Sequence, residues 1–192
     1  SVKIKLGEKI PGNRSQNLKN LKSILQVKII EEGECVNIWI ESRWEKTYSA
    51  NKVRKGLRLI SDQNVDSEVK RACKDFCKWL RSKYIFPIRI PVYLKSSPMI
   101  KAMDGDMVYG TFFEPDSHFV EPYVRIATGD YADMVRDQGK DNALAAILHS
   151  IAHELTHYFQ WINAIALTES GYERQAKAYA NKILEEYAQT RE

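Results

Sequence analysis

The strongest hydrophobic pattern in the chain lies between residues 141 and 163. Apolar side chains recur there with the 3.6-residue period of a helix, at Ala143, Leu144, Ile147, Leu148, Ile151, Leu155, Tyr158, Phe159 and Ile162. Asp141 or Asn142 is expected to cap the first turn, because a short polar side chain can accept a hydrogen bond from an unpaired N–H there. The pattern predicts one long helix that is largely buried.

A second stripe of helical period follows a turn predicted at Thr168–Gly171. Its apolar members are Tyr172, Ala176, Tyr179, Ala180, Ile183, Leu184 and Tyr187. On such a helix Glu173, Ala176 and Ala180 share one face, and the two small alanines allow another helix to approach closely. The two stripes therefore predict a pair of packed antiparallel helices.

Shorter apolar runs upstream predict strands. They cover Phe86–Leu94, Val108–Phe113 and Glu121–Thr128, and a strand-like run also occurs at Val36–Ile40. Pro122 cannot donate a hydrogen bond to a neighbouring strand, which suits a strand at the edge of a sheet. Together with the helices, these runs predict an α+β fold in which a small mixed sheet packs against the long helix.

One more helix is expected from about Val65 to Tyr84, and it bears on the cysteines. Cys73 and Cys77 fall on its buried stripe, and the third cysteine, Cys35, leaves the number odd. This pattern favours buried thiols in a reducing compartment over a disulfide framework. We therefore expect a cytoplasmic protein.

The composition is that of an ordinary soluble domain. The chain has 192 residues, of which 44% are hydrophobic and 28% charged, enough to bury a core. No apolar run reaches the 18 residues that a membrane span needs, and the first thirty residues contain no signal-peptide core. No membrane partner is expected.

Charge divides the chain unevenly. The first sixty residues hold 13 Lys and Arg against 6 Glu, whereas the remainder holds 16 against 19 acidic residues. We expect a basic, strand-containing extension over 1–60 and the main domain over 61–192. A basic segment can bind nucleic acid, but its charges are interspersed with apolar runs, which favours a solvated face.

The first of the two helices also carries the motif H-E-x-x-H. His153 and His157 lie one turn apart and about 40° apart around the axis, so both imidazoles can face one metal ion. Glu154 lies about 100° away, where it can reach a water on that ion. The alternative, two hydrogen-bonded core histidines and a surface acid, leaves buried polar groups to be compensated. The pattern favours a Zn²⁺ site.

A catalytic zinc site needs a third protein ligand. The metzincin continuation, glycine and then histidine, is absent because Gln160 and Asn163 occupy those positions. Glu173 on the second helix is the preferred candidate, and Glu169 in the predicted turn is its rival. His149 lies on the same face but about 12 Å along the axis from the second histidine, too far to share one ion.

The chain resembles the gluzincin branch of the zincin metallopeptidases. The Glu-x-x-Ala-x-x-x-Ala segment that begins at Glu173 is similar to small bacterial and phage-associated zincins, including the ImmA/IrrE type, and the run from Ala152 to Gln160 resembles a wider set of bacterial H-E-L-T-H-x-x-Q proteins. The resemblance implies a zincin-like fold, His153, His157 and Glu173 as zinc ligands, and Glu154 as general base. It also implies that an edge strand beside the active-site helix holds an extended peptide.

The residue that would stabilise the oxyanion is left open. His118, Tyr123 and Tyr179 are the candidates. His118 belongs to a polar loop that also holds Glu114, Asp116 and Glu121, and such a loop more often simply faces solvent.

The expected function is hydrolysis of peptide bonds in a peptide or protein substrate. The alternative is a regulatory or interaction protein with a zincin fold whose zinc is not catalytic.

Overall fold

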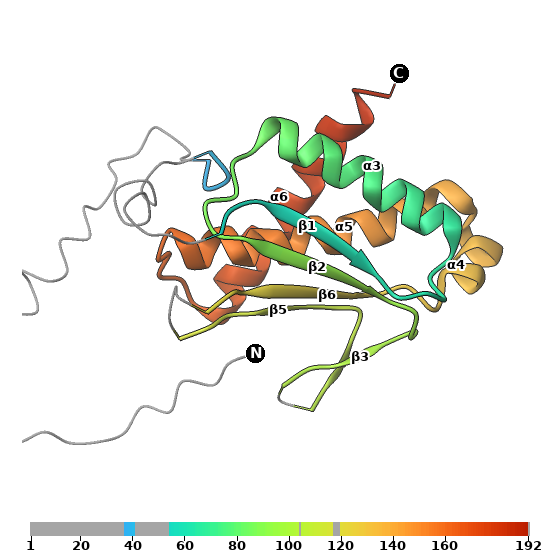
Figure 1. Cartoon of the computed structure of the whole chain (residues 1–192), viewed down its shortest axis with the longest axis horizontal. Helices are drawn as coiled ribbons and strands as arrows, with labels where there is room; N and C mark the ends of the chain where they lie inside the picture. The colour runs from blue at the N-terminus through green and yellow to red at the C-terminus, as the bar shows by residue number, and fades with distance from the viewer. Residues whose placement is uncertain (1–36, 41–53, 104, 117–119, 192) are drawn as a thin grey trace, which may run out of the picture. The chain divides into compact units, whose positions relative to one another are not determined.

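The computed structural model describes residues 37–40, 54–103, 105–116 and 120–191 (Figure 1). By its contacts the chain divides into two units, Ser1–Val36 and Asn37–Glu192, and the described residues belong to the second. They form four helices and six strands, which confirms the α+β class. No helix among them is long and apolar enough to cross a membrane.

The main sheet has four strands. Its order is β1 (Leu57–Ser61), β2 (Ile90–Lys95), β6 (Tyr123–Ala127) and β5 (Gly110–Phe113). The first three strands in this order run parallel, and β5 runs antiparallel to β6. The sheet is therefore mixed, and its antiparallel strand lies at one edge.

A two-stranded antiparallel hairpin precedes that edge strand. It consists of β3 (Ile100–Lys101) and β4 (Met107–Val108). Tyr109 separates β4 from β5, so the single strand expected over residues 108–113 is divided in two.

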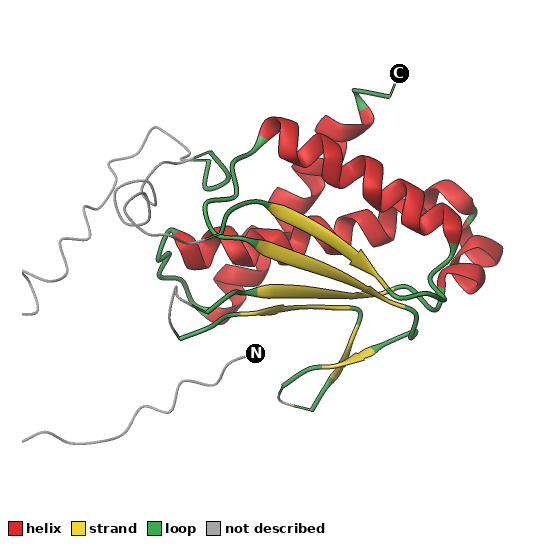
Figure 2. Ribbon diagram, viewed as in Figure 1, coloured by secondary structure: helices red, strands yellow, loops and turns green. Residues whose placement is uncertain are grey.

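All four helices gather on one side of the main sheet (Figure 2). They are α3 (Ser67–Lys83), α4 (Tyr131–Gln138), α5 (Lys140–Ile162) and α6 (Glu169–Ala188). Alternate strand side chains point into this helical layer and are fully buried, among them Val92, Leu94, Val124 and Ile126. The core therefore lies between the sheet and the helices, with α5 in its middle.

The expected helices form, with shifts at their ends. Asp66 caps α3 by accepting a hydrogen bond of 2.7 Å from the N–H of Glu68. The cap expected for α5 at Asp141 or Asn142 is wrong, because the helix begins earlier and Gly139 is its N-cap. The turn expected at Thr168–Gly171 is also wrong, since Thr168 is the N-cap and the next three residues form the first turn of α6.

The position expected for the strand near Pro122 is wrong as well. Its strand, β6, lies between β2 and β5 and not at the edge. Pro122 precedes the strand by one residue, so its missing N–H costs no hydrogen bond between strands. The edge position belongs to β5.

The boundary expected between residues 60 and 61 falls inside β1, which pairs with β2 along its whole length. The strand-like run at Val36–Ile40 does not form a strand in its described part, because Asn37–Ile40 is a turn. Trp39 within it is 1% exposed, and its indole N–H donates a hydrogen bond of 3.2 Å to the hydroxyl of Thr156 on α5.

A buried tyrosine fixes α5 against the start of β2. The hydroxyl of Tyr158 donates a hydrogen bond of 2.6 Å to the carbonyl of Ile88 and accepts one of 3.1 Å from its N–H. Both main-chain groups of Ile88 are thus satisfied away from water. The motif-bearing helix is held at a defined place over the sheet.

Cys73 and Cys77 are free and fully buried on α3, as the sequence predicts. Burial disfavours the charged thiolate, which raises the pKa of Cys77 to about 12 and that of Cys73 still further. Cys35 lies outside the described residues.

Candidate metal centre

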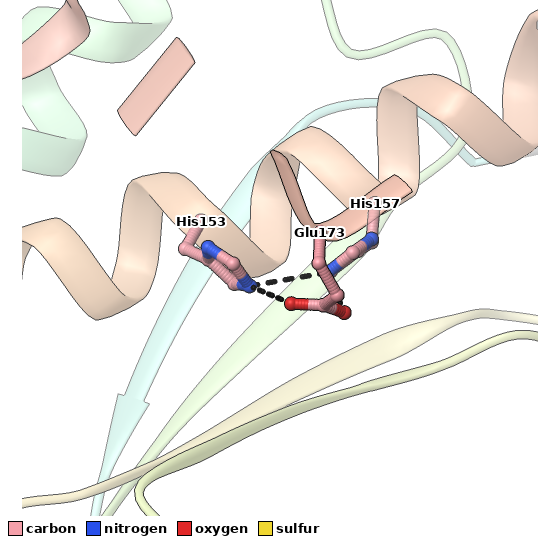
Figure 3. Close-up of side chains that lie close together, drawn as sticks. All are labelled: His153, His157 and Glu173. Atoms are coloured by element: carbon pink, nitrogen blue, oxygen red, sulfur yellow. Dashed lines mark hydrogen bonds and ion pairs between the residues drawn. The ribbon is translucent and has the colours of Figure 1, made fainter. Parts of the chain in front are cut away.

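The two histidines of α5 face the same point. Their Nε2 atoms are 3.2 Å apart, and the ring centroids are 4.9 Å apart. Figure 3 shows both imidazoles projecting from one side of the helix. This is the placement that the four-residue spacing of His153 and His157 predicts.

Glu173 of α6 approaches the same point from across the helix pair (Figure 3). Its carboxylate oxygens lie 3.3 Å from Nε2 of His153 and 3.4 Å from Nε2 of His157. The three ligand atoms all lie within 4.8 Å of one another, and this is the group of possible metal ligands found among the described residues. The two histidine side chains are about one-fifth exposed, 21% and 18%, and that of Glu173 is 61% exposed, so the cluster is open on the α6 side.

The two rival ligands do not join this cluster. Nε2 of His149 lies 3.0 Å from the side-chain oxygen of Asn181 and so is engaged elsewhere on α6. Glu169 is exposed in the first turn of α6 and is not a member of the group.

The spacing of the donors fits a zinc ion. Two ligands bound at about 2.1 Å in tetrahedral geometry lie about 3.4 Å apart, close to the 3.2 Å between the Nε2 atoms. Two imidazole lone pairs and a carboxylate at such distances repel one another unless a proton or a cation lies between them. The donor set of two imidazoles and one carboxylate is one that zinc accepts.

The protonation of the histidines suits metal binding. Burial lowers the pKa of His153, and the neighbouring His157 lowers it further. Burial likewise lowers the pKa of His157, against the opposing effect of Glu173. A lowered pKa favours the neutral imidazole, which is the form that binds metals.

The side chain of Glu154 lies against β5. A Cβ atom added at Gly110 would lie 2.8 Å from its Oε1 and 3.1 Å from its Cγ, so only glycine allows the strand to approach this closely. The main-chain N–H of Phe112 donates a hydrogen bond to the carboxylate. Glu154 is thus held between α5 and the edge strand.

Burial is the main cause that raises the pKa of Glu154 to about 8, and the negative charge of Glu173 adds to it. A carboxyl group with such a pKa can hold or release a proton near neutral pH. A cation at the cluster would favour the carboxylate and lower this pKa again.

Sequence reasoning gave Gln160 no part in the site, although it used this residue to exclude the metzincins and as the last residue of the run that carries the resemblance. Its side-chain oxygen lies 2.7 Å from Nδ1 of His157. The signal was present, because residues three apart on a helix are neighbours.

Of the three expected oxyanion-stabilising residues, the two that the structure describes have other partners. Tyr123 lies on the sheet face opposite the helices and stacks on Phe113, with ring centroids 4.7 Å apart. The hydroxyl of Tyr179 accepts a hydrogen bond of 3.2 Å from the N–H of Ile38. His118 lies outside the described residues.

Two acidic residues of the loop that contains His118 interact with other groups. Glu121 pairs with Arg89 at 3.4 Å. Burial raises the pKa of Glu114, and the nearby Asp116 contributes in the same direction.

Comparisons of the chain with protein-family models, with curated proteins and with solved structures found no match.

Proposed function

We propose that this protein is a zinc-dependent metallopeptidase of the zincin class, gluzincin branch. One observation carries the proposal: His153, His157 and Glu173 converge within 4.8 Å from two packed helices. Glu154, the residue between the two histidines, lies buried next to them. This set provides three metal ligands and one acid–base group, which is what the reaction needs.

Bound by these ligands, zinc would polarise a carbonyl group and lower the pKa of a bound water to about 7. Glu154 would accept a proton from the water and pass it to the departing amine. Its contacts with Gly110 and Phe112 hold the carboxylate in one place for both transfers. A fixed carboxylate reduces the entropic cost of reaching the transition state.

The strand β5 is the proposed place for the substrate backbone. Among the described strands it pairs with β6 alone, so its other edge has no partner strand there. An extended peptide can add to such an edge through main-chain hydrogen bonds. Because Glu154 contacts β5 at Gly110, a peptide on that edge would lie near the acid–base group.

The decisive experiment compares wild type with Glu154→Gln. We expect both proteins to purify with one zinc per chain, measured by elemental analysis, and only the wild type to cleave a peptide library analysed by mass spectrometry. Anomalous scattering at the zinc edge should place the ion between His153, His157 and Glu173. Equal cleavage by the variant, or zinc bound elsewhere, contradicts the proposal.

Bound zinc without cleavage of any peptide would instead favour a non-catalytic zinc-binding protein. The proposed location is the cytoplasm, which accords with two buried free thiols, Cys73 and Cys77. A role for the basic segment in binding nucleic acid stays a prediction, because most of that segment lies outside the described residues.

A further inference from the structure

We propose that Gln160 is a positioning residue for two of the three metal ligands. Its buried side-chain amide orients His157 and holds the turn of α6 that carries Glu173. The inference rests on the proposed zinc site and adds a residue to it. Gln160 is 2% exposed, so its amide has no ready access to water and depends on protein partners. It comes from α5, one turn after the second histidine.

All the partners of this amide belong to the metal centre or flank it. The oxygen lies 2.7 Å from Nδ1 of His157. The nitrogen donates hydrogen bonds of 3.1 Å to the main-chain carbonyl of Tyr172 and 2.9 Å to the side-chain oxygen of Gln175. One side chain thus joins α5 to the first turns of α6.

The chemistry of these partners fixes the orientation of the amide. The carbonyl of Tyr172 can only accept a hydrogen bond, so the amide nitrogen must face α6. The amide oxygen therefore faces His157 and can only accept. Nδ1 of His157 must then carry the proton, which leaves the lone pair on Nε2, the atom directed at His153 and Glu173.

The amide nitrogen of Gln160 acts on the position of Glu173. Tyr172 precedes this glutamate and Gln175 follows it by two residues, so the amide holds α6 on both sides of the third ligand. A glutamate that is 61% exposed has little packing of its own to fix it. The hydrogen bonds from Gln160 hold its helix turn against α5 instead.

Three variants distinguish the effect of the hydrogen bond to His157 from that of the hydrogen bonds to α6. Gln160→Met has a similar shape and makes neither set of hydrogen bonds, whereas Gln160→Glu can still accept from His157 but cannot donate to Tyr172. Gln189→Met makes the same change at the exposed C-cap of α6 and is the matched control. Thermal melts establish that each variant is folded.

The first measurement is nitrogen-15 NMR of the histidine rings in the metal-free wild-type protein at pH 8. We expect His157 with its proton on Nδ1. The same state should persist in Gln160→Glu and be lost in Gln160→Met. A wild-type His157 that carries its proton on Nε2 would overturn the inference, and this result needs no variant to fold.

The second measurement is zinc affinity by competition with a chromophoric chelator. Loss of a hydrogen bond that orients a ligand usually costs about 10–100-fold in affinity, and we expect a loss in this range for Gln160→Met and none for Gln189→Met. An affinity of Gln160→Met within twofold of wild type would overturn the inference. If the wild type itself binds no zinc, the proposed function fails, while the NMR result still decides the orientation of His157.

Discussion

At the scale of single residues, the contact between Gly110 and Glu154 governs how the proposed acid–base group is held. The strand can approach the carboxylate only because residue 110 has no Cβ, which would lie 2.8 Å from Oε1. Side chains do not make contacts that short, so either the strand or the carboxylate must move when a methyl group is added. The free end of the glutamate is the more mobile of the two.

We therefore expect Gly110→Ala to displace Glu154 while leaving the metal ligands in place. A displacement of about 1 Å at a catalytic group can cost about 100-fold in rate. The measurement is kcat/KM for a cleaved peptide together with zinc content, and we expect the first to fall and the second to stay at the wild-type value.

The control for this substitution lies one residue further along the same strand. Thr111 faces the other side of the sheet, opposite Arg125, so Thr111→Ala tests whether any change in β5 reduces the rate. Wild-type turnover in Gly110→Ala would show that the close approach does not position the carboxylate.

At the scale of elements, the end of α5 is closed by a Schellman motif. The N–H of Ala164 bonds to the carbonyl of Trp161 at 3.0 Å, and that of Ile165 to the carbonyl of Gln160 at 3.0 Å. This motif places Ala164 at a φ of +48°, in the left-handed region that a residue with a Cβ avoids.

Ala164→Gly should consequently raise the free energy of unfolding. Relief of the left-handed conformation is worth about 1–2 kcal/mol, partly offset by the greater freedom of glycine in the unfolded chain. We expect a net gain of about 0.5 kcal/mol in urea denaturation. Ala178→Gly, on the exposed face inside α6, should lower stability by about 1 kcal/mol, and a loss at both positions would contradict this account of the turn.

The ends of α3 and α6 are joined by a small polar cluster. Lys83 donates a hydrogen bond of 2.9 Å to Glu186, and the hydroxyl of Tyr84 donates one of 3.2 Å to the same carboxylate. The bond from Lys83 is the main cause that lowers the pKa of Glu186 below its ordinary value of 4.5.

A lowered carboxyl pKa stabilises the folded state above pH 4.5, and that stability is lost as the pH falls through the folded-state value. Glu186→Gln should therefore be less stable than wild type at pH 7 by up to about 1 kcal/mol, and the difference should be smaller at pH 3 than at pH 7. Urea denaturation at both pH values measures this. Glu185→Gln at the exposed neighbouring position is the control, and a difference that persists at low pH would exclude the ionic cause.

Three of the described helices, α3, α5 and α6, were predictable because their apolar positions repeat within a continuous stretch of sequence, whereas α4 was not predicted. The ends of the helices were harder, since caps depend on single hydrogen bonds: Gly139 caps α5 although Asp141 and Asn142 are the better candidates by residue type. The order of the strands was not predictable from Pro122, because that residue lies just outside β6 and constrains nothing within it.

At the scale of the whole molecule, the candidate metal centre is built on a core that does not depend on it. The sheet, α3, α5 and α6 share one buried core. His153, His157 and Glu173 lie at the margin of this core, where the Glu173 side chain is exposed. The fold should survive without metal, in contrast to zinc fingers, which need the ion to fold.

Removal of zinc with a chelator should lower the melting temperature without abolishing the folded state. Ligand binding stabilises by about 2.7 kcal/mol when the free ligand is at 100 times its Kd, and that increment is what chelation removes. Circular dichroism should show the helical signal retained at 25 °C and a cooperative melt at lower temperature. Collapse of the helical signal on chelation would instead mark the zinc as structural.

The helix pair and the convergence of its three side chains, His153, His157 and Glu173, could be inferred from sequence because each helix has a regular apolar stripe that fixes which side chains face the other helix. Contacts between distant segments could not. Trp39 reaches Thr156 across 117 residues, and β1 joins the sheet although its five residues carry little pattern of their own. Such contacts arise from the packing of the whole chain, which no local window of sequence contains.

The division of the ligands between α5 and α6 has a consequence for synthesis. During translation α5 leaves the ribosome before α6, so the nascent chain has both histidines and Glu154 while Glu173 has yet to appear. The proposed zinc site is complete only after α6 packs onto α5 and brings Glu173 to the two histidines. The proposed hydrolysis would therefore begin only after the last helix of the chain has folded into place.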